Sequence, residues 1–297
     1  MSALGGPKQT AGVQPPTGMG LIVSIILIVV ALALAFFLVQ MAGVLAIIGI
    51  IIGGVLIAFG VHFVPVGGAP AAMGQSPGIA TGVAMLAAGA GLAGLFGGAW
   101  AAPFGFAVAL AGGAVGGGLL MAITCTMVNV IYIFGMGIPA ASGKVAKDPI
   151  TGDTFPEYKS QGTEGHGLPF ISWVGGVIGG ALGGLGGTLI YLELLDIYQA
   201  QMPILLNTTV EQIAPVAISL AGIFAVGMFL VNAVLAAYNI TGTIEGPHDP
   251  KFKRFPRAVI AAAAASAVSA SCTATAAPKM KPRASIPAIL CAPVPPA

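Results

Sequence analysis

Charged side chains are rare in this sequence, and this scarcity excludes several classes of protein. Asp, Glu, Lys and Arg make up 7% of the 297 residues, whereas 57% are hydrophobic. Soluble globular domains carry about 25% charged residues, so the chain is not an ordinary soluble domain. The net charge is only +2, and no basic stretch alternates with aromatic residues, which excludes nucleic acid as a partner. The lipid bilayer is therefore the expected surroundings.

Cysteines and catalytic groupings are also scarce. Cys125, Cys272 and Cys291 show neither a CxxC pair nor metal-ligand spacing, which argues against a disulfide framework and a zinc site. Nothing in the sequence resembles a nucleophile with its base, or a pair of catalytic carboxylates. We therefore expect this chain to bind no cofactor and to perform no catalysis by itself.

Ionisable residues are absent from the long apolar runs. The polar residues within these runs are uncharged, among them Thr124, Thr126, Asn129, Thr188, Ser219 and Asn232. An Asp at the centre of a membrane helix would cost about 2.5–3.5 kcal/mol on insertion scales. We therefore expect no carboxylate relay across the bilayer within this chain, and we expect Asn129 and Asn232 to bind neighbouring helices rather than ions.

The apolar runs themselves are long enough to cross a membrane. A bilayer core of about 30 Å requires about 20 apolar residues in a helix, and only helices and closed barrels satisfy their backbone groups in lipid. The runs cover residues 21–39, 41–61, 81–100, 104–138, 170–192, 214–238 and 258–277. They predict an all-α integral membrane protein, a polytopic helical bundle of about six core transmembrane helices with an extra one at the N-terminus.

Two of these regions allow finer predictions. Residues 21–39 and 41–61 are separated only by Gln40, which predicts a tight helical hairpin. Residues 104–138 are too long for one upright crossing. They form either one strongly tilted helix or a short segment followed by a full span from about Gly116.

Glycine is abundant, with 45 residues, many of them inside the apolar runs. Glycine pairs recur every four residues in the segment 175–187, and a similar set occupies residues 112–117. Small residues at this spacing line one face of a helix and allow two backbones to approach closely. The pattern predicts tight helix packing and carries no information about chemistry.

Much of the charge is gathered in two polar islands, residues 144–169 and 239–257. They hold all the basic residues between positions 15 and 277, whereas the segment with Glu193, Asp196 and Glu211 has none. The positive-inside rule places both islands on the cytoplasmic side of the cell membrane. The acidic segment is expected to be a loop on the outer side.

Five island residues are candidates for a cation entrance: Glu164, His166, Glu245, His248 and Asp249. Glu164 and His166 are flanked by glycines just before a span begins, and the other three form a similar group on the same side. A carboxylate at the mouth of a membrane pathway can collect cations. Solvated loop charges are the alternative, and both remain open. His62, at the end of a span, is interpreted as an interfacial residue.

Several unusual strings in the chain resemble one known family. They are His62-Phe-Val-Pro-Val-Gly-Gly-Ala-Pro-Ala-Ala-Met73, Asp148-Pro-Ile-Thr-Gly152, Gln161-Gly-Thr-Glu-Gly-His-Gly-Leu-Pro169, the glycine segment 175–187 and Tyr238-Asn-Ile-Thr-Gly-Thr-Ile-Glu-Gly-Pro-His-Asp-Pro-Lys-Phe-Lys253. In consistent order, from about Met41 to about Ile260, the chain resembles the D subunit of tetrahydromethanopterin S-methyltransferase.

The resemblance implies a membrane subunit of a methanogenesis complex. That complex passes a methyl group from methyl-tetrahydromethanopterin through a corrinoid to coenzyme M, and it exports sodium ions. In the family, subunits C, D and E form the membrane part, whereas corrinoid binding and methyl transfer belong to other subunits. This chain would then be a non-catalytic subunit of a sodium-translocating methyltransferase, and the five candidates would form a cytoplasmic sodium entry. A purely structural scaffold and a stand-alone secondary ion transporter remain alternatives.

The resemblance also divides the chain into three parts. Family members begin near Met41, so residues 1–40 are expected to be an N-terminal extension with an extra transmembrane segment. Residues 41–262 form the membrane domain of the family. Residues 263–297 form an atypical tail rich in Ala and Pro, which leaves open whether residues 258–277 cross the membrane.

Overall fold

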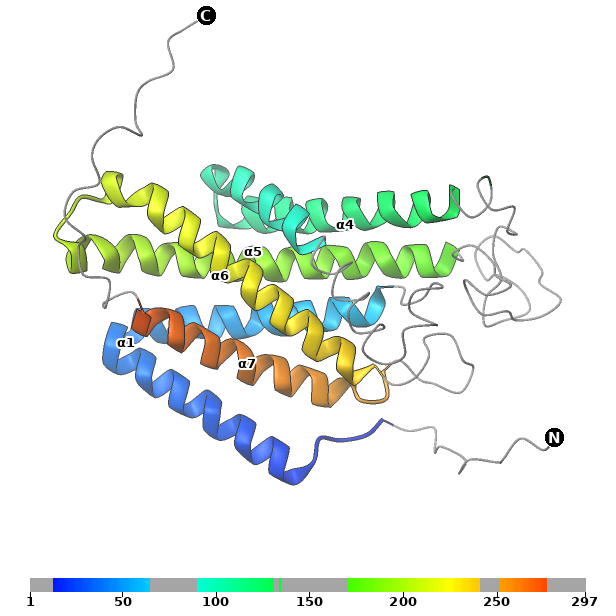
Figure 1. Ribbon diagram of the computed structural model, residues 1–297, viewed down its shortest axis with the longest axis horizontal. Helices are drawn as coiled ribbons and strands as arrows, with labels where there is room; N and C mark the ends of the chain where they lie inside the picture. Colours follow the sequence, from blue (N-terminus) through cyan, green and yellow to red (C-terminus); the bar gives the residue numbers. More distant parts are fainter. Residues whose placement is uncertain (1–12, 65–89, 131–133, 135–169, 241–251, 277–297) are drawn as a thin grey trace, which may run out of the picture.

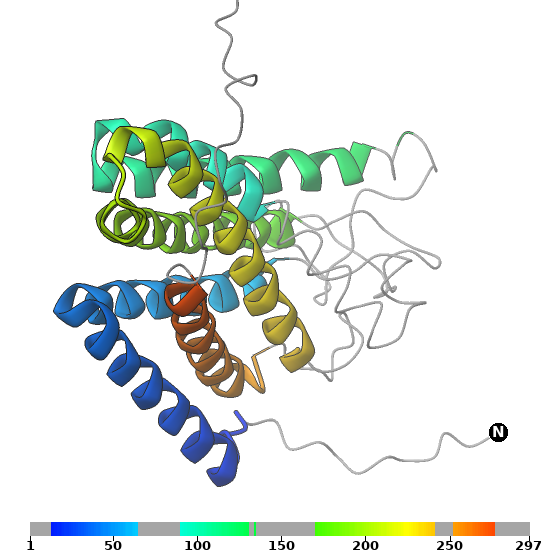
Figure 2. The same ribbon diagram turned by 60° about the vertical axis from the view of Figure 1, so that its left-hand side comes forward.

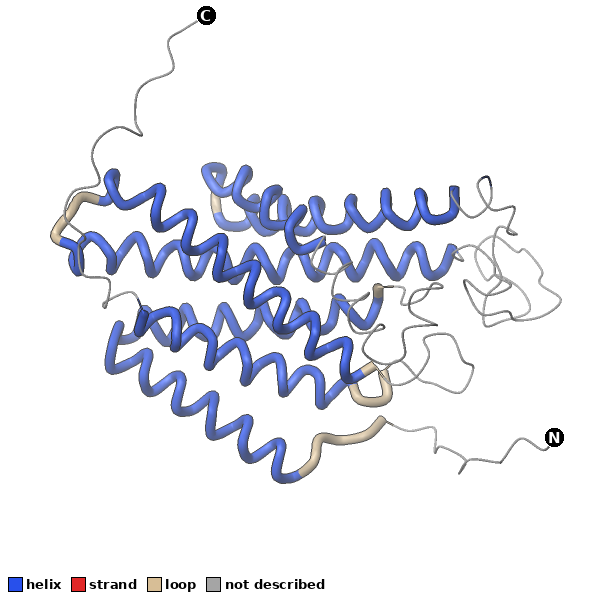
Figure 3. The backbone as a smooth tube through the Cα atoms, in the orientation of Figure 1, coloured by secondary structure: helices blue, strands red, loops and turns tan. Residues whose placement is uncertain are grey.

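The computed structural model describes residues 13–64, 90–130, 134, 170–240 and 252–276, and the secondary structure in these parts is helical (Figure 3). The helices are α1 (Gly18–Phe63), η1 (Ala102–Phe104), α4 (Phe106–Val130), α5 (Phe170–Leu206), α6 (Val210–Asn239) and α7 (Phe255–Ala276), and a shorter apolar helix, Ala90–Phe104, ends in η1. Within these ranges, five helices are long and apolar enough to cross a membrane. The prediction of an all-α polytopic membrane protein is confirmed.

Gln40 divides α1 into a first arm, residues 18–39, and a second arm, residues 41–63. Its backbone is not helical, with φ of 59° and ψ of −148°. The two arms run in opposite directions from this point (Figure 1). The sequence prediction of a hairpin at Gln40 is therefore confirmed.

A second hairpin joins the short helix Ala90–Phe104 to α4. Pro103 lies in the first turn of η1, and Gly105 follows with a φ of 112°, a conformation that favours glycine. The chain reverses here, and α4 starts at once with Phe106. Of the two alternatives for residues 104–138, the one with a separate short segment and a span from Gly116 is wrong, because α4 is unbroken through that position.

The helices form one bundle with α5 in contact with α1, α4 and α6, while α7 packs on α1 and α6. α6 crosses obliquely over its neighbours (Figures 1 and 2). We call the end of the bundle at which α4 and α6 finish and α5 and α7 begin the island end, because these helix ends flank the two polar islands. The opposite end, with the turns at Gln40, Gly105 and Asn207, is the turn end.

Glycine faces bring three helices almost into backbone contact. A Cβ atom on Gly184 of α5 would meet the carbonyl oxygen of Gly113 of α4, and a Cβ on Gly117 would meet that of Gly180. Thr188 then links α5 to the short helix, because its hydroxyl donates a hydrogen bond to the carbonyl of Gly94 at 3.1 Å. The predicted tight packing of the glycine segments is confirmed.

α7 is a complete helix of 22 residues, although its sequence is only weakly apolar. Ala262, Ala267 and Ala270 are buried in the main hydrophobic core. Small side chains allow this helix to lie close to α1 and α6, which compensates for the modest apolar area of each alanine. The predicted domain boundary after residue 262 falls inside α7.

Candidate functional site

The five predicted entrance residues, Glu164, His166, Glu245, His248 and Asp249, lie outside the described residues. The helix ends that flank them are described, and all of these lie at the island end (Figure 1). This placement agrees with the prediction that both islands share one side of the membrane. The sodium entrance itself stays a prediction.

His62 lies at the island end inside an aromatic cluster. Its ring is 1% exposed and packs against Phe252 and Phe255 with centroid distances of 5.5 and 5.0 Å. Its Nδ1 lies 2.7 Å from the carbonyl oxygen of Ala58. His62 lies in the last turn of α1, at a span end as the sequence indicates, and aromatic side chains cover its ring on the inside of the bundle.

α5 continues through Glu193 and Asp196 to Leu206, so the predicted outer loop is wrong for these two acids. Glu211 lies in the first turn of α6, which Thr209 caps by accepting a hydrogen bond from the Gln212 N–H. The signal against a loop is present in the sequence, since residues 188–202 contain neither Gly nor Pro. The two acids do not interrupt the helix, so the presence of charge was a poor guide to where the span ends.

Glu193 is the ionisable residue that the sequence analysis missed. Its side chain is half-buried and packs on α1 at Gly49, where a Cβ atom would meet the carboxylate itself. Gly49 therefore provides the room that the carboxylate occupies. The expectation that the spans of this chain hold no ionisable group is wrong at this position.

Along the bundle axis, Glu193 lies well inside the bundle, away from the turn end. Gly49 is about 13 Å along the second arm from the turn at Gln40, at 1.5 Å per residue. The contacts of Gly98 with Thr188 and of Gly113 with Gly184 place the Gly105 turn at about the level of Glu193. The hairpin therefore stops short of the other helices at the turn end (Figure 1).

The next acid along α5, Asp196, is exposed. Carboxylates are rare in membrane helices, and those that occur face a partner, a water-filled cavity or an ion pathway. Glu193 can neutralise its charge by binding a cation or a proton. We take Glu193, together with Gly49, as the candidate functional site among the described residues.

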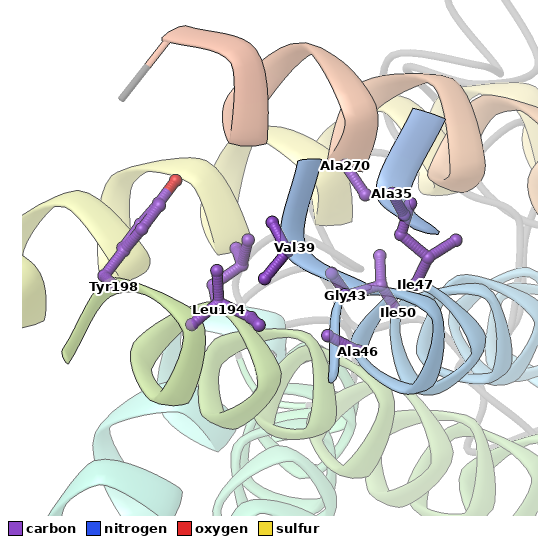
Figure 4. Close-up of a pocket in the computed structure, with 10 residues that line it drawn as sticks. Ala35, Val39, Gly43, Ala46, Ile47, Ile50, Leu194, Tyr198 and Ala270 are labelled. Carbon is purple, nitrogen blue, oxygen red and sulfur yellow. The ribbon is translucent and has the colours of Figure 1, made fainter. Parts of the chain in front are cut away.

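An apolar pocket lies next to Glu193 on the turn side. Figure 4 shows it between the two arms of α1, α5 and α7, with Leu194 and Tyr198 of α5 facing Val39 and Ile50 of α1. Ala270 closes it from α7. The pocket wall is almost entirely hydrocarbon, so the pocket by itself offers a cation no ligands.

Comparison with known proteins decides the family. The model of the family described as the D subunit of tetrahydromethanopterin S-methyltransferase matches residues 43–266. The chain belongs to this family. Curated relatives that carry the same description include those of Methanosarcina mazei, 51% identical over 213 residues (71% of this chain, 85% of the relative), and Methanothermobacter marburgensis, 53% identical over 209 residues (70% and 86%). The relative from Methanopyrus kandleri is 48% identical over 211 residues (71% and 87%).

The family match covers the candidate site. Gly49 and Glu193 both lie inside residues 43–266, as do the glycine contacts between α4 and α5. The first arm of α1 lies outside the match, although it supplies Ala35 and Val39 to the apolar pocket. The candidate site therefore belongs to the part of the chain that matches the family, and part of the pocket wall does not.

Proposed function

We propose that this chain helps to form the ion-translocating membrane part of a complex that couples methyl transfer, from methyl-tetrahydromethanopterin to coenzyme M, to sodium export. It would lie in the cell membrane with its polar islands on the cytoplasmic side and with membrane subunits C and E as partners. Methyl transfer and the corrinoid would belong to other subunits. The sodium ion is the cargo of this chain.

The position of Glu193 on a membrane helix is the observation that carries the proposal. An ionised carboxylate in an apolar interface is costly unless a cation accompanies it, because the low dielectric weakens its solvation. A bound sodium ion would neutralise the carboxylate, and it would dissociate again when the environment of the carboxylate becomes more polar. The exposed Asp196, one turn further along α5, would extend the oxygen-bearing surface toward a sister subunit or toward water.

The test is purification through a tag on this chain from gently solubilised membranes, followed by reconstitution into liposomes. We expect co-purified methyltransferase subunits, the absorbance of a corrinoid and uptake of radioactive sodium during methyl transfer. If the complex transfers methyl groups without moving sodium, the proposed translocation is refuted and the chain is a purely structural scaffold of the complex. A corrinoid-free oligomer of this chain that moves sodium alone would instead support the secondary transporter.

The predicted cytoplasmic entrance is tested by Glu164→Gln. Removal of this charge is expected to raise the sodium concentration for half-maximal methyl transfer about tenfold, which corresponds to about 1.4 kcal/mol. Glu157→Gln in the same island is the control, because Glu157 has no flanking glycine and is not one of the five candidates, and it should leave the sodium dependence unchanged. Equal sodium curves for Glu164→Gln and the unaltered complex would remove Glu164 from the entrance.

A further inference from the structure

Asn232 of α6 and Ser266 of α7 meet against Gly54 of α1 in the interior of the bundle. Both side chains are 1% exposed. The Asn232 amide nitrogen donates to the Ser266 hydroxyl oxygen at 2.9 Å and to the carbonyl oxygen of Met228 at 2.9 Å. A Cβ atom at position 54 would collide with the Ser266 hydroxyl, so the glycine lets the α1 backbone approach the two polar groups. The expectation that Asn232 binds a neighbouring helix is confirmed.

The orientation of this amide leaves one oxygen without a partner. The Met228 carbonyl can only accept a hydrogen bond, so the amide nitrogen must face it and Oδ1 must point away. Asn232 Oδ1 is fully buried and has no hydrogen-bond partner within the described structure. A buried acceptor without a donor costs about 1–3 kcal/mol, which a bound positive charge or a donor would recover. Contacts between the helices satisfy the hydrogen-bonding capacity of the amide nitrogen, but they leave the amide oxygen without a donor.

The two oxygens lie one helical turn from the apolar pocket. Ala270, which lines the pocket, follows Ser266 by four residues on the same face of α7. Ile50, which also lines it, precedes Gly54 by four residues on α1. Leu194, the neighbour of Glu193, contributes to the same wall. Along the second arm of α1, the pocket therefore lies on the turn side of both Glu193, which packs at Gly49, and the buried Asn232–Ser266 pair, which packs at Gly54.

We propose that Asn232 Oδ1 and the Ser266 hydroxyl oxygen are ligands of a sodium site inside the bundle, reached through the apolar pocket. This inference rests on the proposed sodium translocation and deepens it. Carbonyl and hydroxyl oxygens replace the hydration shell of an alkali cation, as they do in membrane channels and transporters. A neutral site of this kind binds an ion without trapping it, because no fixed charge has to be separated when the ion leaves.

Sodium binding to the purified complex tests this inference. The thermal midpoint of the complex is measured in NaCl and in KCl of equal ionic strength, and sodium titrations give the half-saturating concentration. Ser266→Ala removes the hydroxyl oxygen, whereas Asn232→Leu replaces the amide with two methyl groups and so removes both its oxygen and the nitrogen that bonds Met228 and Ser266. We expect both to raise the half-saturating sodium concentration at least tenfold and to shrink the difference between the two salts.

Ser271→Ala is the matched control. Ser271 lies on the same helix, is also buried, and donates to the carbonyl of Ala267 in its own helix at 2.9 Å. It should leave the sodium titration unchanged. If Asn232→Leu fails to assemble, Ser266→Ala decides the question, because the loss of one hydroxyl group leaves the fold intact.

The outcomes separate this inference from the function on which it rests. An unaltered complex whose stability and methyl transfer ignore sodium would refute the proposed function. A sodium-dependent complex in which Ser266→Ala and Asn232→Leu keep the unaltered titration would overturn only the interior site. Equal destabilisation by these variants in NaCl and in KCl would assign the Asn232 oxygen to a buried water, and it would overturn the site as well.

Discussion

Gly184→Ala is expected to separate α4 from α5 and to cause a large loss of stability. The new Cβ would meet the carbonyl oxygen of Gly113 and lie 3.1 Å from the Gly117 Cα, both backbone atoms that cannot rotate away. Overpacking of cores costs about 1–3 kcal/mol when side chains can adjust. Because backbone atoms block the new methyl group here, we expect a loss of about 3 kcal/mol or more in the free energy of unfolding. The measurement is the thermal midpoint of the purified complex, which should fall by about 10 °C.

The neighbouring glycine provides the matched control. A Cβ atom on Gly183 would lie 3.4 Å from the nearest atom of the Phe229 ring, which is an ordinary contact with a side chain. Gly183→Ala should therefore be tolerated, with a gain of up to about 1 kcal/mol from the higher helix propensity of alanine. Gly222 of α6 has nothing within 4 Å of such an atom and should behave in the same way. Equal losses at positions 183 and 184 would refute the explanation by backbone contact.

Glu193→Gln is expected to have the largest effect on function while leaving the fold intact. Glutamine keeps the shape of the side chain against Gly49 and removes its negative charge. Because an interior cation then loses its counter-charge, we expect the half-saturating sodium concentration to rise between tenfold and a hundredfold, equivalent to about 1.4–2.7 kcal/mol. The measurements are methyl transfer as a function of sodium concentration and radioactive sodium uptake by liposomes that contain the complex.

Glu211→Gln is the control for Glu193, since Glu211 is an exposed acid in the first turn of α6. Its carboxylate interacts with the helix N-terminus and water, so its loss should cost at most about 1 kcal/mol of stability and leave sodium affinity unchanged. Gly49→Ala is a second probe, because its methyl group would displace the Glu193 carboxylate without removing it. If Glu193→Gln and Glu211→Gln give the same sodium curve, Glu193 is not an ion ligand.

The parts of the fold that depend on one helix at a time can be predicted from the sequence. The hairpin at Gln40 follows from two apolar runs with a single polar residue between them, and the structure has the reversal at that residue. The glycine faces of α4 and α5 follow from their spacing of four residues, which puts the glycines on one side of each helix. These predictions succeed because periodicity and length are local properties.

The candidate sites can be predicted only in part. Charge and flanking glycines indicate the five island residues, which lie outside the described part of the chain. For Glu193, charge favours a loop, whereas the absence of helix breakers around it favours the helix that the structure has. In a bundle, a carboxylate within a helix is acceptable when a neighbouring glycine provides room, and the sequence does not reveal which glycine lies opposite.

The sequence by itself determined that this chain is a helical membrane protein, where most of its helices run and to which family it belongs. The helical membrane fold follows from apolar length, since lipid demands that each helix satisfy its own backbone. Only the tertiary structure decided which polar atoms meet: Glu193 against Gly49, and Asn232 with Ser266 against Gly54. Such pairings depend on the rotation and register of packed helices, which are set by the glycine contacts along their whole length and not by any one segment.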